Sequence, residues 1–272
     1  MIKRIYLEIT NSCNLNCSFC EAKKNHDFMH LDDIKRNLDE ISEVTDYVYL
    51  HILGEPLSHP FFNDILDYTD KLNLKVQLVT NGTLLYKYPD IFKHSSLRKL
   101  SISIHSIDNI DISNDYFDII NKLIDYPKNN QYLELRFYDL NNLKYNALNY
   151  YNYLNDKYNF LNTTKKQSYK ILDNTYIYIQ DLFHWPNIND PFISNNGKCL
   201  GAINMLGILC NGDVVMCCLD PSGHTKIGNI YDNKLIDIIN SKTYINLIND
   251  MKKGKLSFPL CQKCTYRLRF DK

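Results

Sequence analysis

Strand-like segments alternate with helical segments along the first two thirds of the chain, and this alternation constrains the fold more than any other feature. Six segments have a strand pattern: residues 5–10, 47–53, 75–80, 100–105, 133–138 and 176–180. Amphipathic, helix-like segments separate them: residues 31–44, 61–72, 89–94, 116–125 and 145–158. Strands joined through helices form right-handed βαβ units and a parallel sheet. Because a closed barrel needs eight such units, we predict an α/β fold with a partial (βα)6 barrel.

The alternate residues of these strands predict a polar lumen. One set in each strand is apolar and would pack beneath the helices. The other set is polar: Tyr6, Glu8, Thr10, Tyr49, His51, Glu55, Ser101, Ser103, His105, Glu134, Arg136, Tyr138, Tyr176, Tyr178 and Gln180. Unpaired buried polar groups are costly, so this lumen should hold water or a polar ligand. A half-solvated antiparallel sheet gives the same alternation, but the intervening helices favour the parallel arrangement.

The pattern changes after about residue 185. Trp185-Pro186 and Asp190-Pro191 indicate a linker. Residues 204–209 and 213–218, joined through Asn211-Gly212, have the pattern of a β-hairpin. A single helix is expected over residues 234–251. We therefore predict two domains, residues 1–185 and 186–272, the second a small C-terminal module of a hairpin and a helix.

Charge and hydropathy exclude several classes of protein. The chain has 31 basic and 31 acidic residues, so it has no general attraction to nucleic acid or anionic membranes. No apolar run approaches the roughly 18 residues that span a bilayer. The first strand begins within a few residues of Met1, which leaves no room for a signal peptide. We expect a cytoplasmic protein, in which clustered cysteines indicate metal binding or catalysis rather than disulfides.

Three of the nine cysteines lie close together near the start of the chain. Cys13, Cys17 and Cys20 have the spacing C-x3-C-x2-C directly after the first strand. Such a triad can hold three corners of a cubane iron–sulfur cluster. The next cysteine is Cys199, so one iron would stay open to a ligand. The alternative is a structural zinc site completed by His26 or His30.

These residues resemble the motifs of the radical SAM superfamily. In that family the open iron binds the amino and carboxylate groups of S-adenosylmethionine, and one electron cleaves it to a 5'-deoxyadenosyl radical. The resemblance implies that Phe19, the aromatic residue before Cys20, lies beside the adenine. It also implies a flavodoxin- or ferredoxin-type electron donor.

Three further segments resemble the ligand-binding loops of the family. Leu53-Gly54-Glu55-Pro56 is similar to its glycine-glycine-glutamate-proline motif, with Leu53 in place of the first glycine. The resemblance implies that Glu55 and the neighbouring backbone hold the methionyl ammonium. Thr80-Asn81-Gly82 resembles another ligand-facing loop. Ser103 and His105 occupy positions that often reach the ribose or the carboxylate.

Four of the later cysteines form a second set with the spacing C-x17-C-x43-C-x2-C: Cys199, Cys217, Cys261 and Cys264. Together with the hairpin and Gly228-Asn229-Ile230, this set resembles the auxiliary-cluster modules called SPASM and twitch. The length suits the short form, with one additional 4Fe-4S cluster. Four thiolates would leave no iron open, which favours electron transfer over substrate binding. A four-thiolate zinc site is the alternative.

Two cysteines, Cys210 and Cys218, fall outside both sets. They could be small buried hydrophobic residues, or hydrogen-atom donors to a substrate radical. Cys218 could also replace Cys217 as a ligand.

The expected cofactors are therefore S-adenosylmethionine and two 4Fe-4S clusters, and the expected outcome is a net two-electron oxidation. Candidates for the catalytic group are Glu134, Arg136, His51 and Cys218, although Arg136 could instead pair with Glu134. The protein's own part is to orient the substrate, remove a proton and exclude water.

The cysteine spacing is similar to that of radical SAM dehydrogenases of aminocyclitol antibiotic biosynthesis, which suggests a secondary alcohol of a sugar or cyclitol as substrate. The alternative is modification of a ribosomally made peptide, by crosslinking, epimerisation or thioether formation, or of a residue on a partner protein. Because the first strand starts so early, we expect no leader-recognition domain in the chain, which favours a small substrate. A zinc-stapled binding module without radical chemistry is the non-enzyme alternative. The cysteine triad and Glu55 favour the enzyme.

Overall fold

The computed structural model describes residues 2–21, 27–127, 130–162 and 167–271. Within these residues, one sheet has the strand order β10–β9–β8–β1–β2–β3–β4–β5–β7–β6. The strands are β1 (Arg4–Leu7), β2 (Tyr47–Tyr49), β3 (Lys75–Thr80), β4 (Leu97–Ser103), β5 (Tyr132–Tyr138), β6 (Ser168–Leu172), β7 (Thr175–Gln180), β8 (Met205–Ile208), β9 (Asp213–Val215) and β10 (Lys226–Asn229).

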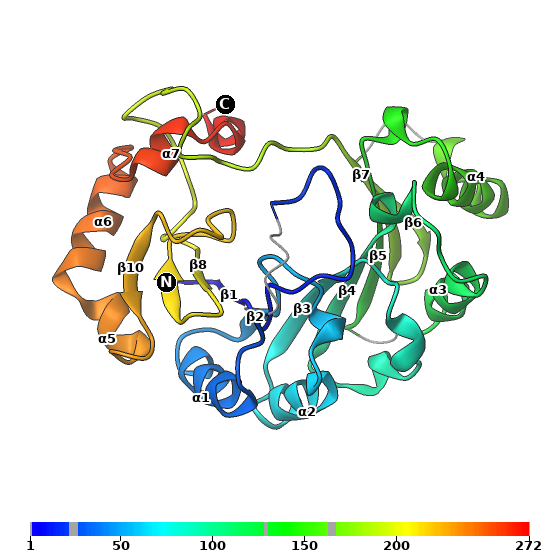
Figure 1. Ribbon diagram of the computed structural model, residues 1–272, viewed down its shortest axis with the longest axis horizontal. Coiled ribbons are helices and arrows are strands. Elements are labelled where there is room, and N and C mark those ends of the chain that lie inside the picture. The colour runs from blue at the N-terminus through cyan, green and yellow to red at the C-terminus, as the bar shows by residue number, and fades with distance from the viewer. Residues whose placement is uncertain (1, 22–26, 128–129, 163–166, 272) are drawn as a thin grey trace.

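The six predicted parallel strands are present and adjacent. Pairing is parallel from β1 through β2, β3, β4 and β5 to β7. The helices are α1 (Leu31–Ser42), α2 (Phe62–Lys71), α3 (Tyr116–Ile124), α4 (Asn146–Tyr158), α5 (Leu235–Asn240), α6 (Lys242–Lys252) and α7 (Pro259–Lys263). Figure 1 shows a curved sheet with α1 to α5 on its outer side and the linker after β7 crossing its open side. The predicted partial barrel is confirmed.

The apolar set of each strand packs under the helices, as the alternation predicts. Leu133, Leu135 and Phe137 of β5 are fully buried, and so are Ile34 and Leu38 of α1. Each buried side chain of this size contributes about 1.5–3 kcal/mol to stability. This burial turns the polar residues of the same strands toward the concave side.

The predicted hairpin forms, but it continues the barrel sheet. β8 and β9 are antiparallel, and β8 also pairs in parallel with β1, from Arg4 opposite Met205 to Leu7 opposite Ile208. β1 would otherwise be an exposed edge strand, and unpaired edges are unfavourable. The C-terminal segment therefore places its cysteines directly beside the barrel.

Two predicted helices differ from those observed. The helix expected over residues 234–251 breaks into α5 and α6, because Ser241 leaves the helical conformation and its hydroxyl caps α6 by accepting from the Tyr244 backbone N–H. Residues 89–94 form only a short 3-10 turn, Ile91–Lys93. The other 3-10 turns are Pro56–Ser58, Leu85–Lys87, Ile104–Ile107, Leu140–Asn142, Phe160–Asn162 and Tyr266–Phe270.

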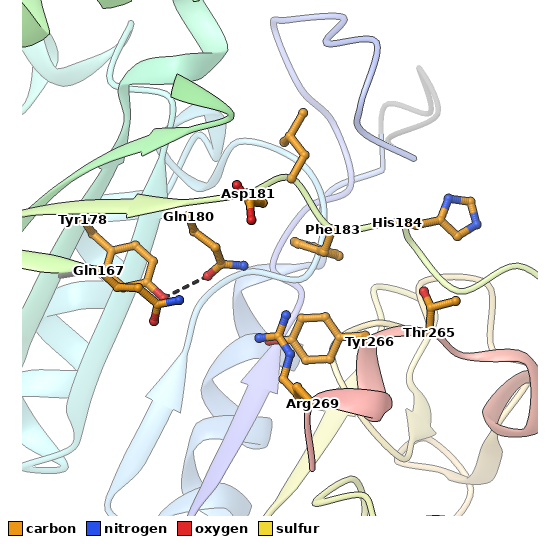
Figure 2. Close-up of a pocket in the computed structure, with 10 residues that line it drawn as sticks. Gln167, Tyr178, Gln180, Asp181, Phe183, His184, Thr265, Tyr266 and Arg269 are labelled. Atoms are coloured by element: carbon orange, nitrogen blue, oxygen red, sulfur yellow. Dashed lines mark hydrogen bonds between the residues drawn. The ribbon is translucent and has the colours of Figure 1, made fainter. Parts of the chain in front are cut away.

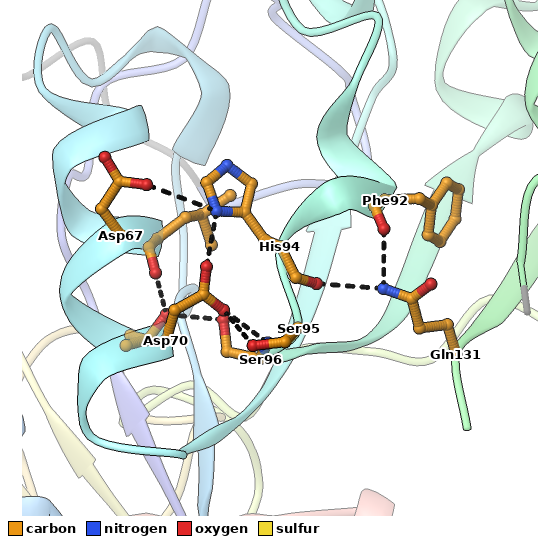
Figure 3. Close-up of polar contacts among 9 residues, drawn as sticks. Asp67, Asp70, Phe92, His94, Ser95, Ser96 and Gln131 are labelled. Atoms are coloured by element: carbon orange, nitrogen blue, oxygen red, sulfur yellow. Dashed lines mark hydrogen bonds and ion pairs between the residues drawn. The ribbon is translucent and has the colours of Figure 1, made fainter. Parts of the chain in front are cut away.

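A polar network fastens α2 to the start of β4 on the outer side of the barrel (Figure 3). The Asp70 carboxylate accepts hydrogen bonds from the Ser96 backbone N–H at 2.6 Å and the Ser95 hydroxyl at 3.0 Å. His94 Nδ1 lies 2.9 Å from the same carboxylate. Gln131 donates to the carbonyls of Phe92 and His94. All of these bonds fix the segment that leads into β4, so we assign this network a structural role.

Among the described residues, no helix is both long enough and apolar enough to cross a membrane.

Candidate active site and cluster-binding thiols

The loop that carries Cys13, Cys17 and Cys20 follows β1, and its first residues pack against Gly54. Gly54 has a φ of +76°, and a Cβ atom there would lie 2.5 Å from the Thr10 carbonyl oxygen and 2.9 Å from that of Ser12. The next residue, Glu55, donates its backbone N–H to the Ser12 carbonyl at 2.8 Å. Only glycine permits so close an approach. The glycine of the Gly-Glu-Pro segment therefore fixes the start of the cysteine loop.

The first three thiols are close enough to influence one another. Burial raises the pKa of Cys13, and burial together with the charges of Cys20 and Cys13 raises the pKa of Cys17 to about 11. Two N–H groups point at Cys13 Sγ, from the Leu15 backbone at 3.4 Å and from Asn81 Nδ2 at 3.9 Å. N–H donors directed at sulfur stabilise an iron–sulfur cluster. Thiols that are hard to ionise without a nearby positive charge also fit such a site, because the irons supply that charge.

The Glu55 carboxylate is occupied by protein donors. It accepts hydrogen bonds from the Thr80 hydroxyl at 2.7 Å, the Asn81 backbone N–H at 2.7 Å and the Leu57 backbone N–H at 3.0 Å. The side chain is 1% exposed, and burial raises its pKa to about 7. Glu55 thus joins the end of β2 to the end of β3 and positions Asn81 beside Cys13. This leaves the neighbouring backbone, rather than the carboxylate, as our expected partner of the ammonium.

Pro56 begins the short turn Pro56–Ser58 that Glu55 caps. Thr80 is the last residue of β3 and Asn81 follows it. The Asn81 carbonyl accepts a hydrogen bond from the Tyr116 hydroxyl at 2.8 Å. The predicted Thr80-Asn81-Gly82 loop therefore contacts both the Gly-Glu-Pro segment and the cysteine loop.

An aromatic slot lies beside the cysteine loop. The ring of Phe19 is 5.3 Å from that of His105, which stacks on Tyr138 at 4.5 Å with an angle of 8° between the planes. His105 Nδ1 lies 3.2 Å from the Arg136 carbonyl oxygen, and burial lowers the pKa of His105 to about 4. Phe19, His105 and Tyr138 line a cavity of about 420 Å³ that Cys17 also borders. The rest of the lining includes several polar side chains, among them Asn16, Asp108 and Asn142, and aromatic faces combined with polar groups suit a nucleoside base.

Ser103 ends β4, and its carbonyl accepts from the Ser106 hydroxyl at 2.6 Å. His105 lies one turn beyond the strand, in the turn Ile104–Ile107. The two residues therefore point from different elements, although the sequence pattern placed both at the end of one strand.

The polar set of the strands meets in the lumen. Glu134 accepts from Arg136 Nε at 2.7 Å and from the Ser101 hydroxyl at 3.0 Å, and it pairs with Lys99 Nζ at 3.3 Å. Burial alone would raise the pKa of Glu134, but the charges of Arg136 and Lys99 hold it below its ordinary value. The structure therefore shows Arg136 as an ion-pair partner of Glu134, and both as parts of one network.

His51 lies on the same side of the barrel, with its ring 5.7 Å from that of Tyr6. Burial, and next the charges of Arg136 and Lys99, lower the pKa of His51 to about 3. Within the described residues its Nδ1 is buried without a hydrogen-bond partner. A neutral His51 beside two cations is a weak base.

Four thiols from three segments form the second set. Cys199 precedes β8, Cys217 follows β9, Cys261 lies in α7 and Cys264 follows α7. Burial and then the charge of Cys218 raise the pKa of Cys217, with smaller contributions from Cys261 and Cys199. The Gly201 backbone N–H donates to Cys199 Sγ at 3.3 Å. A mutually interacting set of four thiols with N–H donors fits a closed iron–sulfur cluster.

The geometry does not favour the zinc alternatives. Around a zinc ion with Zn–S bonds of about 2.3 Å, sulfurs would lie about 3.8 Å apart. In the part of the chain that the structure describes, the only three metal-ligand atoms within 4.8 Å of one another belong to Asp67, Asp70 and His94 of the outer network. His30 is exposed at the start of α1, and His26 lies outside the described residues. Neither thiol set is arranged around one small ion.

The two remaining cysteines differ in their surroundings. Cys210 donates its thiol to the Glu8 carbonyl at 3.0 Å and its backbone N–H to the Glu8 carboxylate at 3.1 Å, so it fastens the hairpin to β1. Cys218 interacts with Tyr6 of the lumen, and burial raises the pKa of its thiol to about 11. Cys218 therefore lies between the second thiol set and the lumen.

Sequence reasoning missed a cavity between β7, the linker that follows it and the C-terminal turn. Figure 2 shows Tyr178 and Gln180 of β7, Phe183 of the linker, and Tyr266 and Arg269 of the C-terminal turn around a space of about 560 Å³. Leu182 lines this cavity and also the aromatic slot. These segments are far apart in the sequence and share no motif. They come together only because the linker after β7 passes beside the C-terminal turn.

Comparison with protein families identifies both regions. Residues 7–135 match the radical SAM superfamily, and residues 199–265 match the SPASM iron-sulfur cluster-binding domain. The chain is a radical SAM protein with a SPASM domain. S-adenosylmethionine and iron–sulfur clusters are therefore its cofactors, and the predicted family is confirmed.

Curated relatives match this radical SAM protein over part of their length. The AdoMet-dependent heme synthase of Methanosarcina barkeri is 33% identical over 104 residues, covering 36% of this chain and 29% of the relative. The tungsten-containing aldehyde ferredoxin oxidoreductase cofactor-modifying protein of Pyrococcus furiosus is 35% identical over 89 residues, 31% of this chain and 25% of the relative. The match therefore spans less than a third of either relative.

Solved structures share the fold over nearly the whole chain. BtrN in complex with AdoMet and 2-DOIA has a TM-score of 0.61 at 16% identity, covering 97% of this chain and 93% of BtrN. The enzyme anSMEcpe with bound AdoMet and Cp18Cys peptide has a TM-score of 0.62 at 14% identity, covering 100% and 91%. SuiB of Streptococcus suis bound to precursor peptide SuiA has a TM-score of 0.56 at 16% identity, covering 97% and 71%. At these identities the likeness is one of fold.

Proposed function

We propose that this radical SAM protein oxidises a secondary alcohol of a sugar or cyclitol. In this proposal Cys13, Cys17 and Cys20 would hold a 4Fe-4S cluster with one iron open to S-adenosylmethionine. Cys199, Cys217, Cys261 and Cys264 would hold a second 4Fe-4S cluster, which would serve as the electron acceptor. The observation that carries the proposal is the difference between the two thiol sets, three on one side of a polar lumen and four on the other. We assign the two functions to residues 1–185 and 186–272.

The residues around the first set have defined tasks in this scheme. The aromatic slot of Phe19, His105 and Tyr138 receives the adenine, and Ser103, at the end of β4, reaches the ribose or the carboxylate. The backbone of the Gly54 to Pro56 segment receives the ammonium, while Glu55 and Thr80 hold Asn81 against the cysteine loop. When bound, S-adenosylmethionine supplies a 5'-deoxyadenosyl radical that removes one hydrogen atom from the substrate.

The oxidation balances with the groups named. The alcohol carbon gives its hydrogen atom to the adenosyl group, the hydroxyl gives its proton to a base, and one electron goes to the oxidised second cluster, leaving a carbonyl. Glu134, Arg136, His51 and Cys218 remain our candidates for handling the proton. Arg136 already carries its proton, and burial raises the pKa of the Cys218 thiol to about 11, so this thiol is protonated near pH 7 and cannot accept a proton. We therefore rank the Glu134 carboxylate and the neutral His51 imidazole above them, although the nearby cations weaken both as bases.

The lumen supports a small polar substrate. Its walls offer tyrosine phenols, and the Glu134 carboxylate there already forms a connected network with Ser101, Arg136 and Lys99. Such groups recognise hydroxyls in fixed positions. The cavity beside Tyr178 and Tyr266 gives this substrate a route from the protein surface to the lumen.

The alternative is modification of a peptide or of a residue on a partner protein. The fold likeness to anSMEcpe with a bound peptide and to SuiB with its precursor peptide favours it. An extended peptide would occupy the cavity beside Tyr178 and Tyr266 and place one residue in the lumen.

Anaerobic reconstitution with iron and sulfide tests the proposal. We expect about eight irons per chain for two 4Fe-4S clusters, and formation of 5'-deoxyadenosine with dithionite. A panel of aminocyclitols that includes 2-DOIA, and separately a panel of short peptides, is then assayed. A product two mass units lighter than a cyclitol, with deuterium from the alcohol carbon in 5'-deoxyadenosine, supports oxidation. A modified peptide supports the alternative. Absence of iron, or of 5'-deoxyadenosine with full iron, would refute radical chemistry.

A further inference from the structure

Arg267 is the largest fully buried side chain of the described residues, and one of its donors is unused. It lies in the turn Tyr266–Phe270 and is 2% exposed. Its Nε donates to the Cys261 carbonyl at 3.2 Å, and its Nη1 donates to Asp271 at 3.0 Å. Within the described residues, Nη2 is buried with no hydrogen-bond partner. A buried guanidinium N–H without an acceptor costs free energy, so this arrangement calls for a missing acceptor.

The residues around Arg267 lie on the segments that carry the second thiol set. A Cβ atom on Gly197, two residues before Cys199, would lie 2.1 Å from Nη1. The Lys198 backbone N–H donates to Asp271 at 2.8 Å. The guanidinium is therefore enclosed between the loop that carries Cys199 and the helix that carries Cys261, in a space that the absence of a side chain at Gly197 provides.

The positive charge lies against two segments that carry these thiols, because Nε contacts the Cys261 carbonyl and Nη1 lies beside Gly197, two residues before Cys199. Asp271, the ion-pair partner of Arg267, is 35% exposed, so solvent screens the carboxylate more than it screens the guanidinium. The wall beside these thiols therefore holds one buried cation, Arg267, opposed by the partly exposed Asp271 and by the buried carboxylate of Asp220.

We propose that Arg267 is the counter-charge and N–H donor of the auxiliary cluster and favours its reduced form. This inference rests on the proposed second cluster. Reduction adds one electron to a buried, thiolate-bound group, and a buried cation beside it stabilises the more negative state. Arg267 is thus a positioning residue that makes the cluster a better acceptor for the electron that the substrate radical releases.

The test isolates the auxiliary cluster. The full chain with Cys13→Ala, Cys17→Ala and Cys20→Ala is reconstituted and its iron counted, with about four irons expected. The midpoint potential is then measured by potentiometric titration followed by electron paramagnetic resonance. In this background, Arg267→Met should lower the ratio of reduced to oxidised cluster at a fixed potential at least tenfold, which is about 59 mV for one electron. Arg267→Lys should recover most of the shift.

Two further variants control for structure. Arg269→Gln removes an exposed cation of the same turn, which stacks on Tyr266 at 3.6 Å, and should change the ratio less than twofold. Asp271→Asn removes the opposing carboxylate and should change the ratio in the direction opposite to Arg267→Met. This second variant also decides the outcome if Arg267→Met loses its iron.

The outcomes separate the two proposals. An iron-free triple-cysteine variant would refute the auxiliary cluster itself. With iron present, an unchanged potential in Arg267→Met, an equal shift in Arg269→Gln, or a shift of Asp271→Asn toward the oxidised form would overturn the role of Arg267 and leave the cluster standing.

Discussion

The two thiol sets are built in opposite ways. Cys13, Cys17 and Cys20 lie on one loop after β1, whereas the second set comes from the loop before β8, the end of β9 and α7. The first set is local in sequence and is supported from outside, by Gly54, Glu55 and Asn81. The second set is distant in sequence and supports itself, because its own segments form the wall around it.

This difference predicts that the fold depends on the two clusters to different degrees. Removing a cluster from the first loop should leave the barrel intact, since the sheet does not need the loop. Removing a cluster from the second set should release α7 and the linker, because cross-links between distant segments restrict the unfolded chain most. The first set should therefore govern chemistry and the second should govern both chemistry and stability.

The largest effect is expected at the first set. Cys17→Ala should reduce 5'-deoxyadenosine formation to background and remove about half of the iron, because two thiolates cannot hold the cluster. The melting temperature should change little. The measurements are an iron count, a chromatographic assay for 5'-deoxyadenosine and thermal unfolding under anaerobic conditions. Ser18→Ala, on the same loop, is the control. A large loss of stability in Cys17→Ala would break the comparison.

A smaller catalytic effect but a larger structural one is expected at the second set. Cys261→Ala should stop product formation while 5'-deoxyadenosine still forms, because hydrogen abstraction does not need the second cluster. The melting temperature of the reconstituted protein should fall by several degrees. Cys210→Ala is the matched control, as Cys210 bonds Glu8 and belongs to neither set. Equal melting temperatures for Cys261→Ala and Cys17→Ala would contradict the difference in construction.

The same contrast explains what the sequence could reveal. The local spacing of the first set, the alternation of the strands and the Gly-Glu-Pro segment each act over a few residues, so the family and the barrel were predictable and are confirmed. The pairing of β8 with β1 was not, because the register of two strands about 200 residues apart depends on which edge is free. The break at Ser241 was missed because the apolar pattern runs through it.

The second site shows the limit more sharply. Its four cysteines could be grouped from their resemblance to a family. Arg267 and Tyr266 belong to no sequence motif, so their roles could not be predicted. Arg267 is buried only because Gly197 and Asp271 receive it after the chain has folded. The role of Glu55 in holding Asn81 could likewise not be predicted, since two of the donors to its carboxylate, Thr80 and Asn81, lie 25 and 26 residues further along the chain.

The crowding of the first loop can be measured with glycine substitutions. Gly54→Ala should destabilise the protein by about 2–4 kcal/mol, because it adds backbone strain at positive φ and a contact of 2.5 Å with the Thr10 carbonyl oxygen. Gly223→Ala has a similar φ of +77° but meets its nearest atom only at 3.6 Å, and should cost about 1 kcal/mol. Chemical denaturation of the unreconstituted protein measures both.

Gly201→Ala extends this comparison to the second set. Its added Cβ atom would lie 3.5 Å from Cys199 Sγ, an ordinary contact, so this variant should keep its iron while Gly54→Ala loses iron from the first cluster. Equal costs for Gly54→Ala and Gly223→Ala would show that Gly54 serves backbone conformation alone, without holding the cysteine loop.

The smallest effect is expected at the outer network, whose carboxylates and imidazole have no part in either thiol set. Burial alone would raise the pKa of Asp70, but hydrogen bonds from Ser96, His94 and Ser95 lower it below its ordinary value. The stabilisation is therefore complete above the unfolded pKa of 3.8 and is lost as the pH falls through the lower, folded value. Asp70→Asn should cost about 1 kcal/mol at pH 7 and converge with the parent protein in acid.

Iron content and 5'-deoxyadenosine formation should be unchanged in Asp70→Asn. Urea denaturation at several pH values and an iron count after reconstitution check both statements. Loss of iron in this variant would mean that a site without cysteine contributes to metal binding, and the division of the molecule into two thiol sets would then be incomplete. An unchanged iron count would support metal binding by cysteine sulfur alone. The number of cysteine ligands, three in one set and four in the other, then decides which cluster keeps an open iron.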